Sequence, residues 1–377
     1  MSSTSDAADV ADASRADAVR PDAVRGDAVR AAAESRAIVA AGLGGLSGLI
    51  GGLIVFAGRL VGLADGALPV GSFAALVAGI VGVPVFAITY VRADSRRGRG
   101  REVVRRSRLR RAIDVIGLTL TASAMVMLLI AALFSIAQLA FRSLEIGAFA
   151  AAVLTAGAVA ASTYALSLLA SDITTQRVAT LLALFLAAGT LSSMLSAEDE
   201  LWWQNNFSAL GMRGVSGSYS FNVTVILSGL VLITLSGYLT RDLRVRSIRY
   251  AVPARGVGIV RTLLVVVGVA FMGVGAVPVD VSQLLHNMFS VCLIIAFVVL
   301  IAACPTLIAG LPRAFVAASA VFVAGMVLIV LLWVPFGYYN LTAVELLAVV
   351  VVFTWLVLFT RNVSTGQMPD GDARLDA

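Results

Sequence analysis

Ten apolar stretches, each close to the length that crosses a bilayer, dominate this chain. A transmembrane helix needs about 20 consecutive apolar residues. Backbone polar groups in lipid must be satisfied within the segment, and these runs lack the period-two alternation of barrel strands. We therefore predict an all-α, polytopic membrane bundle of about ten transmembrane helices. The predicted spans are 37–63, 69–91, 112–138, 146–169, 178–196, 221–240, 259–279, 284–303, 314–334 and 342–360.

The placement of basic residues predicts the orientation of these spans. All 28 basic residues are Arg, and 25 of them lie in segments that share one side of the membrane with the N-terminus. Two of the others, Arg142 and Arg213, lie in loops on the opposite side, and Arg59 lies near that end of the first span. Because basic residues are retained in the cytoplasm, we predict that both termini are cytoplasmic. The Arg-, Ala- and Val-rich composition indicates a bacterial plasma membrane, and the net charge of +6 is no sign of nucleic-acid binding.

Polar tails flank the predicted spans. Residues 1–36 carry a five-residue unit, Arg-x-Asp-Ala-Val, which begins at Arg15, Arg20 and Arg25 and decays from Arg30. A five-residue period does not match the 3.6-residue helical period, so no single apolar face forms. We predict that residues 1–36 are a disordered or transiently helical cytoplasmic tail, and that residues 362–377 form a second disordered tail.

Small residues repeat within the first span. Gly44, Gly48 and Gly52 recur every four residues and share one helix face. Such a face permits close approach of another helix. Internal packing is the favoured interpretation, and a dimer interface is the alternative.

The densest run of charge is the loop from Arg92 to Arg111, which holds ten Arg residues. The favoured interpretation is a determinant of topology. The alternative is a contact with anionic lipid headgroups. The side chains expected to make that contact are Arg96, Arg97, Arg105 and Arg106.

Polar side chains gather at the predicted outer face, where loop 197–220 is the longest. The carboxylate of Asp280 and the imidazole of His286, at one membrane depth, could bind a lipid headgroup or move a proton. The alternative is that His286 and Asn287 cap a helix start and bond to nearby backbone. Two further carboxyl groups, Asp114 and Glu345, lie near span ends. The candidate outer-face site comprises Trp203, Asn206, Ser208, Asn222, Asp280, His286 and Asn287.

Several kinds of chemistry find little support in the composition. One His and two Cys are too few for an ordinary zinc site, which takes three or four ligands. The absence of Lys excludes a lysine Schiff base. No G-x-S-x-G motif frames Ser208 as a nucleophile. We therefore expect no metal, no cofactor and no catalytic residues, and we do not predict an enzyme.

Short motifs in the second half resemble a known family. These are Phe207-Ser-Ala-Leu-Gly, Phe221-Asn222, Val277-Pro-Val-Asp280 and His286. Their order over about 178–360 resembles the bacterial membrane family called domain of unknown function 998, which is distantly similar to the Frag/DRAM/Sfk group. Ala209 stands where that family tends to carry Asp. The resemblance implies a six-helix core at 178–361, preceded by a four-helix extension at 37–170, and it implies no reaction.

Three functions remain open at this point. The first is binding, sensing or remodelling of lipid at the outer leaflet, with membrane lipids as partners. The second is a small-solute permease, and the third is a non-catalytic membrane scaffold.

Overall fold

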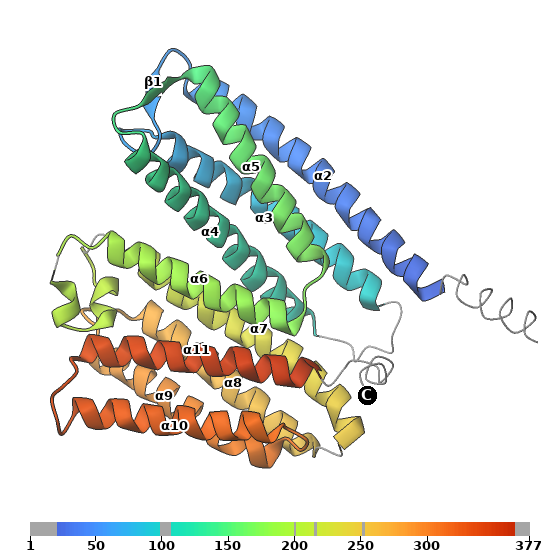
Figure 1. The fold of residues 1–377 in the computed structure, drawn as a ribbon, viewed down its shortest axis with the longest axis vertical. Coiled ribbons are helices and arrows are strands. Elements are labelled where there is room, and N and C mark those ends of the chain that lie inside the picture. The colour runs from blue at the N-terminus through green and yellow to red at the C-terminus, as the bar shows by residue number, and fades with distance from the viewer. Residues whose placement is uncertain (1–20, 99–106, 200, 215–216, 251–252, 366–377) are drawn as a thin grey trace, which may run out of the picture.

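The computed structural model describes residues 21–98, 107–199, 201–214, 217–250 and 253–365. Within these ranges, ten helices are long and apolar enough to cross a membrane, and sheet is almost absent (Figure 1). The predicted all-α helical bundle is therefore confirmed, and the chain is an integral, multipass membrane protein. The cytoplasmic location of the termini stays a prediction.

The helices follow the ten predicted spans in order, with ends shifted by several residues. Two short 3-10 helices, η1 (Trp202–Gln204) and η2 (Phe207–Gly211), lie in the loop between α6 and α7. The long helices are α2 (Pro21–Val55), α3 (Val70–Gly98), α4 (Arg108–Ala140), α5 (Ala148–Ser171), α6 (Thr175–Leu195), α7 (Ser218–Tyr250), α8 (Ala254–Ala276), α9 (Gln283–Leu307), α10 (Arg313–Trp333) and α11 (Leu341–Thr365).

The helices extend into the segments predicted as tails. Residues 21–36 belong to α2, and residues 362–365 continue α11. Ala, Arg and Glu, which favour helix, are frequent in 27–36, and extending a helix already formed by the adjoining span avoids the cost of nucleation. The rest of both predicted tails, 1–20 and 366–377, lies outside the described residues.

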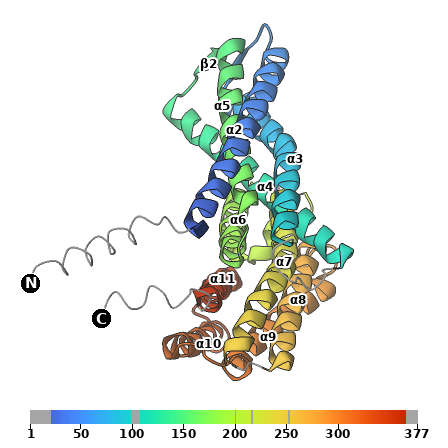
Figure 2. The ribbon, with the colours of Figure 1, turned by 90° about the vertical axis from the view of Figure 1, so that its right-hand side faces the viewer.

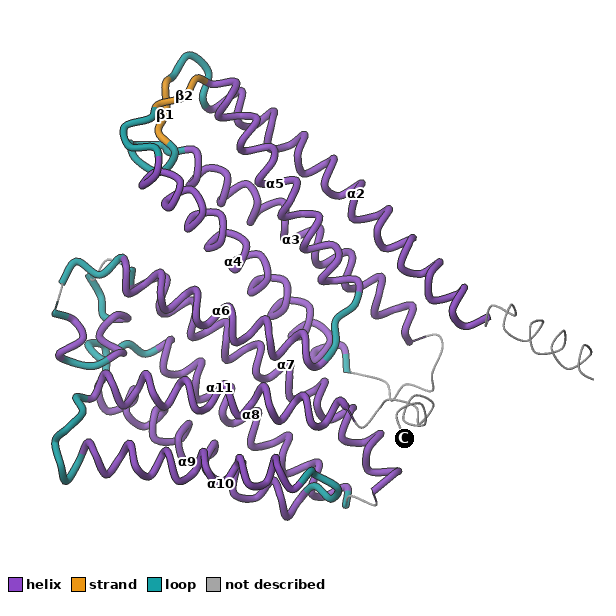
Figure 3. Tube along the Cα trace, in the orientation of Figure 1, coloured by secondary structure: helices purple, strands orange, loops and turns teal. Residues whose placement is uncertain are grey.

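A small β-ribbon corrects the ends of two predicted spans. Residues 60–62, assigned to the first span, form strand β1 (Leu60–Gly62), which pairs antiparallel with β2 (Glu145–Gly147). Figure 3 shows the ribbon at one end of the bundle. Strands of three residues are too short to give a periodic signal in the sequence. The ribbon joins the α2–α3 and α4–α5 connections.

The helices pack as two groups that meet along α4. In the first group, α2 lies along α5, and α3 packs against α4 and α5. In the second group, α8 lies between α7 and α9, while α11 contacts α6, α7 and α10. Helix α4 also contacts α6 and α7, and the two views in Figures 1 and 2 agree on this arrangement. The two groups divide between α5 and α6. That the extension (37–170) and the core (178–361) are separate units stays a prediction.

The glycine face of α2 packs inside the bundle. A Cβ atom added at Gly52 would lie 2.7 Å from the Cα atom of Ala152 in α5. One added at Gly44 would overlap the Thr163 hydroxyl oxygen. The glycine repeat therefore packs α2 against α5 inside the bundle, in agreement with the favoured prediction of internal packing.

Large aromatic side chains fill the second group. Trp355 of α11 is fully buried, stacks on Phe359 with ring centroids 4.9 Å apart, and meets Phe297 edge-on. Its indole N–H donates to the Ser319 hydroxyl at 2.9 Å. Aromatic contact area and this hydrogen bond together fix α9, α10 and α11 to one another.

Candidate functional site

The α6–α7 connection folds back onto the helices as a cap, which we define as residues 201–214. Within it, Phe207 and Leu210 are buried, and Phe207 meets Phe221 of α7 edge-on at 5.3 Å. These apolar contacts explain why a polar-looking loop adopts a folded 3-10 turn. The cap covers one end of the second helix group.

A carboxylate from α11 holds the start of η2. Glu345 accepts a hydrogen bond from the backbone N–H of Phe207. The hydroxyl and backbone N–H of Ser208 also hydrogen-bond to this carboxylate. Ser208 is buried, so its hydroxyl is engaged in structure and is not presented to solvent. The negative charge at the first N–H groups of a 3-10 turn is electrostatically favourable.

Other predicted site residues also hold the cap by its backbone. The Asn222 amide donates to the Gly211 carbonyl at 2.8 Å. The Asp280 carboxylate accepts from the Arg213 backbone N–H at 3.2 Å. The Trp203 carbonyl accepts from the Asn340 amide at 2.8 Å, while its indole side is half-exposed. Hydrogen bonds from α7, α11 and the α8–α9 connection therefore converge on the cap.

The N-cap residue of α9 differs from the two residues that the sequence suggested, His286 and Asn287. The N-cap residue of α9 is Ser282, whose hydroxyl accepts a hydrogen bond from the Leu285 N–H at 3.4 Å. His286 is buried, and its Nδ1 pairs with the Val277 carbonyl at 2.8 Å. Asn287 is exposed. The alternative that His286 and Asn287 are the N-cap residues of α9 was wrong, because both lie inside the first turns of this helix. The expected hydrogen bond between His286 and nearby backbone is present.

The predicted pair Asp280 and His286 thus serves two separate backbone contacts. Asn206 lies at the N-cap of η2, and its Oδ1 is buried with no hydrogen-bond partner among the described residues. An unpaired buried amide oxygen is costly, so a donor from outside the chain would relieve this cost.

An apolar groove of about 560 Å³ runs between α6 and α11 beneath the cap. Helix α6 lines it with six residues from Ala183 to Met194, α11 with seven from Leu346 to Leu358, and Phe207 closes its cap end. The Thr190 hydroxyl donates to the Leu186 carbonyl of its own helix, so it does not make the groove polar. Neither Asp280 nor His286 lines the groove.

The basic loop is described only in part. Arg96 is exposed at the end of α3 and lies within electrostatic range of Arg36. Arg97 belongs to α3, but its side chain is outside the described part of the chain. Arg105 and Arg106 lie outside the described residues altogether. Their predicted headgroup contact stays a prediction.

Sequence reasoning placed Glu345 near the end of the last span but did not join it to the site. The signal was present, because a carboxylate inside a predicted span demands a partner. Its partners are backbone N–H groups more than a hundred residues away, which no side-chain pattern encodes. The groove was missed for a similar reason, since its lining looks like any other lipid-facing or core sequence.

Comparison with family models, with curated proteins and with solved structures gives no significant match for this chain. The resemblance to domain of unknown function 998 therefore stays a prediction.

Proposed function

We propose that this protein binds a lipid acyl chain in the groove between α6 and α11, at the outer leaflet of a bacterial plasma membrane. The observation that carries the proposal is the apolar lining of the 560 Å³ groove. Pockets of about 300–1,000 Å³ are the size that holds small ligands. A groove without charged lining suits a hydrocarbon chain better than a polar solute.

The length of the groove supports the same ligand. Leu346 and Leu358 lie twelve residues apart on α11, which is about 18 Å along a helix. One leaflet of a bilayer has a hydrocarbon depth of roughly 15 Å, half of the full core. A single acyl chain entering from one leaflet therefore matches the groove from end to end.

The cap gives this groove a defined end. Phe207 closes it, and Glu345, Ser208 and Asn206 lie at the same end. The unpaired Asn206 oxygen would accept a hydrogen bond from a hydroxyl or amine of a headgroup. Binding of lipid by this arrangement needs no metal and no catalytic residue.

Photo-crosslinking tests the proposal directly. The purified protein would be reconstituted with a phospholipid that carries a photoreactive group on its acyl chain, and labelled peptides would be identified by mass spectrometry. We expect labelling concentrated on 183–194 and 346–358. Equal labelling of the lipid-facing surface of α10 would show ordinary bilayer contact and contradict the proposal.

A groove-filling variant sharpens this test. Ala187→Phe places a ring in the groove, and we expect labelling there to fall several-fold. Val321→Phe is the matched control, since Val321 is 70% exposed on α10 and outside the groove. A permease would instead show solute uptake into proteoliposomes, and a scaffold would co-purify with the same partners whether or not the groove is filled.

A further inference from the structure

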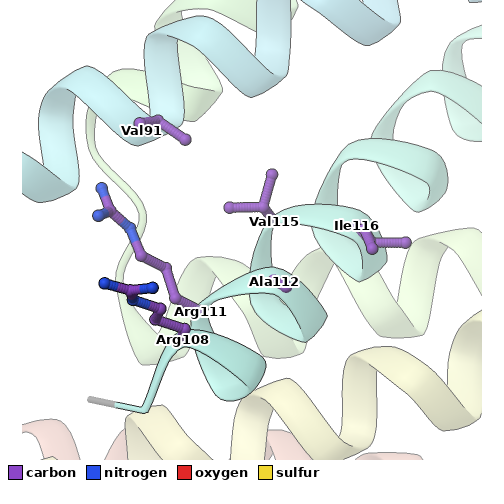
Figure 4. A pocket seen from close by; sticks show the side chains of 6 residues that line it. All are labelled: Val91, Arg108, Arg111, Ala112, Val115 and Ile116. Atoms are coloured by element: carbon purple, nitrogen blue, oxygen red, sulfur yellow. The ribbon is translucent and has the colours of Figure 1, made fainter.

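A second pocket lies at the opposite, Arg-rich end of the bundle, between the end of α3 and the start of α4. Its volume is about 370 Å³, and it is lined by Val91, Arg108, Arg111, Ala112, Val115 and Ile116 (Figure 4). In Figure 4 the two guanidinium groups lie beside one another on one side of the pocket, with Val91 above them and Ala112, Val115 and Ile116 on the other side. The pocket thus has a cationic part and an apolar part.

The two arginines differ in how they are held. Arg111 is fixed by Asp94, whose carboxylate lies 3.4 Å from its Nε, and by a 3.0 Å hydrogen bond to the Ser95 hydroxyl. No hydrogen bond or ion pair of the Arg108 side chain occurs within the described residues. The N-terminus of the 33-residue helix α4, which carries the positive end of the helix dipole, lies beside both arginines. Two adjacent guanidinium groups beside a helix N-terminus, one of them oriented by Asp94 and Ser95, favour an anion.

The apolar part identifies the source of that anion. Ile116 lines the pocket and is 52% exposed, and its neighbour on α4, Leu120, is 41% exposed. The pocket floor therefore continues into the lipid-facing surface of α4. A soluble anion gains nothing from this floor, whereas a phospholipid can place its phosphate at the arginines and a chain along α4.

We propose that this pocket binds an anionic phospholipid from the leaflet at the Arg-rich end, through Arg108 and Arg111, with an acyl chain against Val115 and Ile116. The site is separate from the α6–α11 groove and does not depend on the function proposed for it. It also extends the headgroup contact predicted for Arg96 to two other arginines that line a defined cavity.

Native mass spectrometry of the full chain tests this site. The protein would be mixed with equal amounts of phosphatidylglycerol and phosphatidylcholine bearing identical chains. We expect a preference for phosphatidylglycerol that falls about fivefold in Arg108→Gln, the effect of removing one cation near anionic lipid. Arg110→Gln is the matched control, because it removes the same charge from the same first turn of α4 but does not line the pocket.

Three results would overturn the proposal. One is an equal loss in Arg108→Gln and Arg110→Gln, which would mean a diffuse surface charge. Another is complete displacement of the lipid by inorganic phosphate, which would mean a site for soluble anions. The third is unchanged lipid binding in Val115→Trp, which fills the floor without altering charge. Thermal unfolding of each variant would verify that it is folded, and Ala187→Phe in the distant groove should leave this preference unchanged.

Discussion

The two helix groups differ in the side chains that fill them. In the first group, which comprises α2, α3, α4 and α5, glycines bring helix backbones together, as Gly52 does against Ala152. In α6–α11, the interior is built from large rings around Trp355, and a folded cap closes one end. Lipid removes most of the hydrophobic drive between helices, so each group must gain stability from contact area or from hydrogen bonds. The first group gains contact from the closeness of backbones. The second group combines large rings with close backbones of its own, since a Cβ atom added at Gly229 of α7 would lie 2.5 Å from the Gly268 carbonyl oxygen of α8.

Removing the largest ring should have the largest effect. Trp355→Ala leaves a cavity among α9, α10 and α11 and removes the donor to Ser319. We expect a loss of about 3–5 kcal/mol in the free energy of unfolding. The measurement is reversible unfolding in mixed micelles, with Trp333→Ala, 37% exposed, as the control. Equal losses in both variants would contradict a stabilising role of the buried Trp355 ring.

Adding a side chain should damage the first group instead. Gly52→Val places atoms where the Ala152 backbone lies, and overpacking of this kind costs roughly 1–3 kcal/mol. Gly42→Val is the control, because nothing lies within 4 Å of a Cβ at Gly42. Thermal unfolding should separate the two variants. If Gly52→Val were as stable as wild type, the close α2–α5 contact would be refuted.

The cap should depend on one carboxylate. Glu345→Ala leaves the Phe207 N–H and the Ser208 hydroxyl without their acceptor, at a cost of roughly 1–3 kcal/mol. We expect faster hydrogen exchange at 207–211 with little change in α2–α5. Glu145→Ala, which removes an exposed carboxylate from β2, is the control and should leave exchange in the cap unaltered.

The junction between the groups should show the smallest effect. The hydroxyls of Tyr90 in α3 and Tyr238 in α7 form a buried 2.7 Å hydrogen bond. Loss of either hydroxyl in Tyr90→Phe or Tyr238→Phe should cost about 0.5–1.5 kcal/mol. In a double-mutant cycle the second substitution should add little, because the bond is already absent. Additive losses would mean that the two hydroxyls act independently.

Much of the fold could be predicted from sequence because its signal is local. Each span is a continuous apolar run, and the helix ends were shifted mainly where helix-forming residues continue past the apolar part, as at 21–36. The β1–β2 ribbon could not be predicted, since a three-residue strand is defined by a partner some 85 residues away.

The candidate site was predicted less completely than the fold. Ser208, Asn222 and Asp280 do gather around one loop, as their shared membrane side suggested. Asn222 and Asp280 bond to the backbone of that loop, whereas Ser208 bonds to the Glu345 carboxylate. Backbone donors and acceptors are the same for every residue type, so sequence patterns do not reveal which of them a side chain will meet.

The sequence by itself determined that this protein is a helical membrane bundle, because apolar length and the obligation to satisfy backbone groups in lipid leave no other structure for these segments. Tertiary structure alone decided which helices touch, that α6 and α11 leave a groove between them, and that Glu345 meets the start of η2. Those outcomes depend on how side chains of distant segments fit together, and such a fit is a property of pairs of surfaces that no single segment carries.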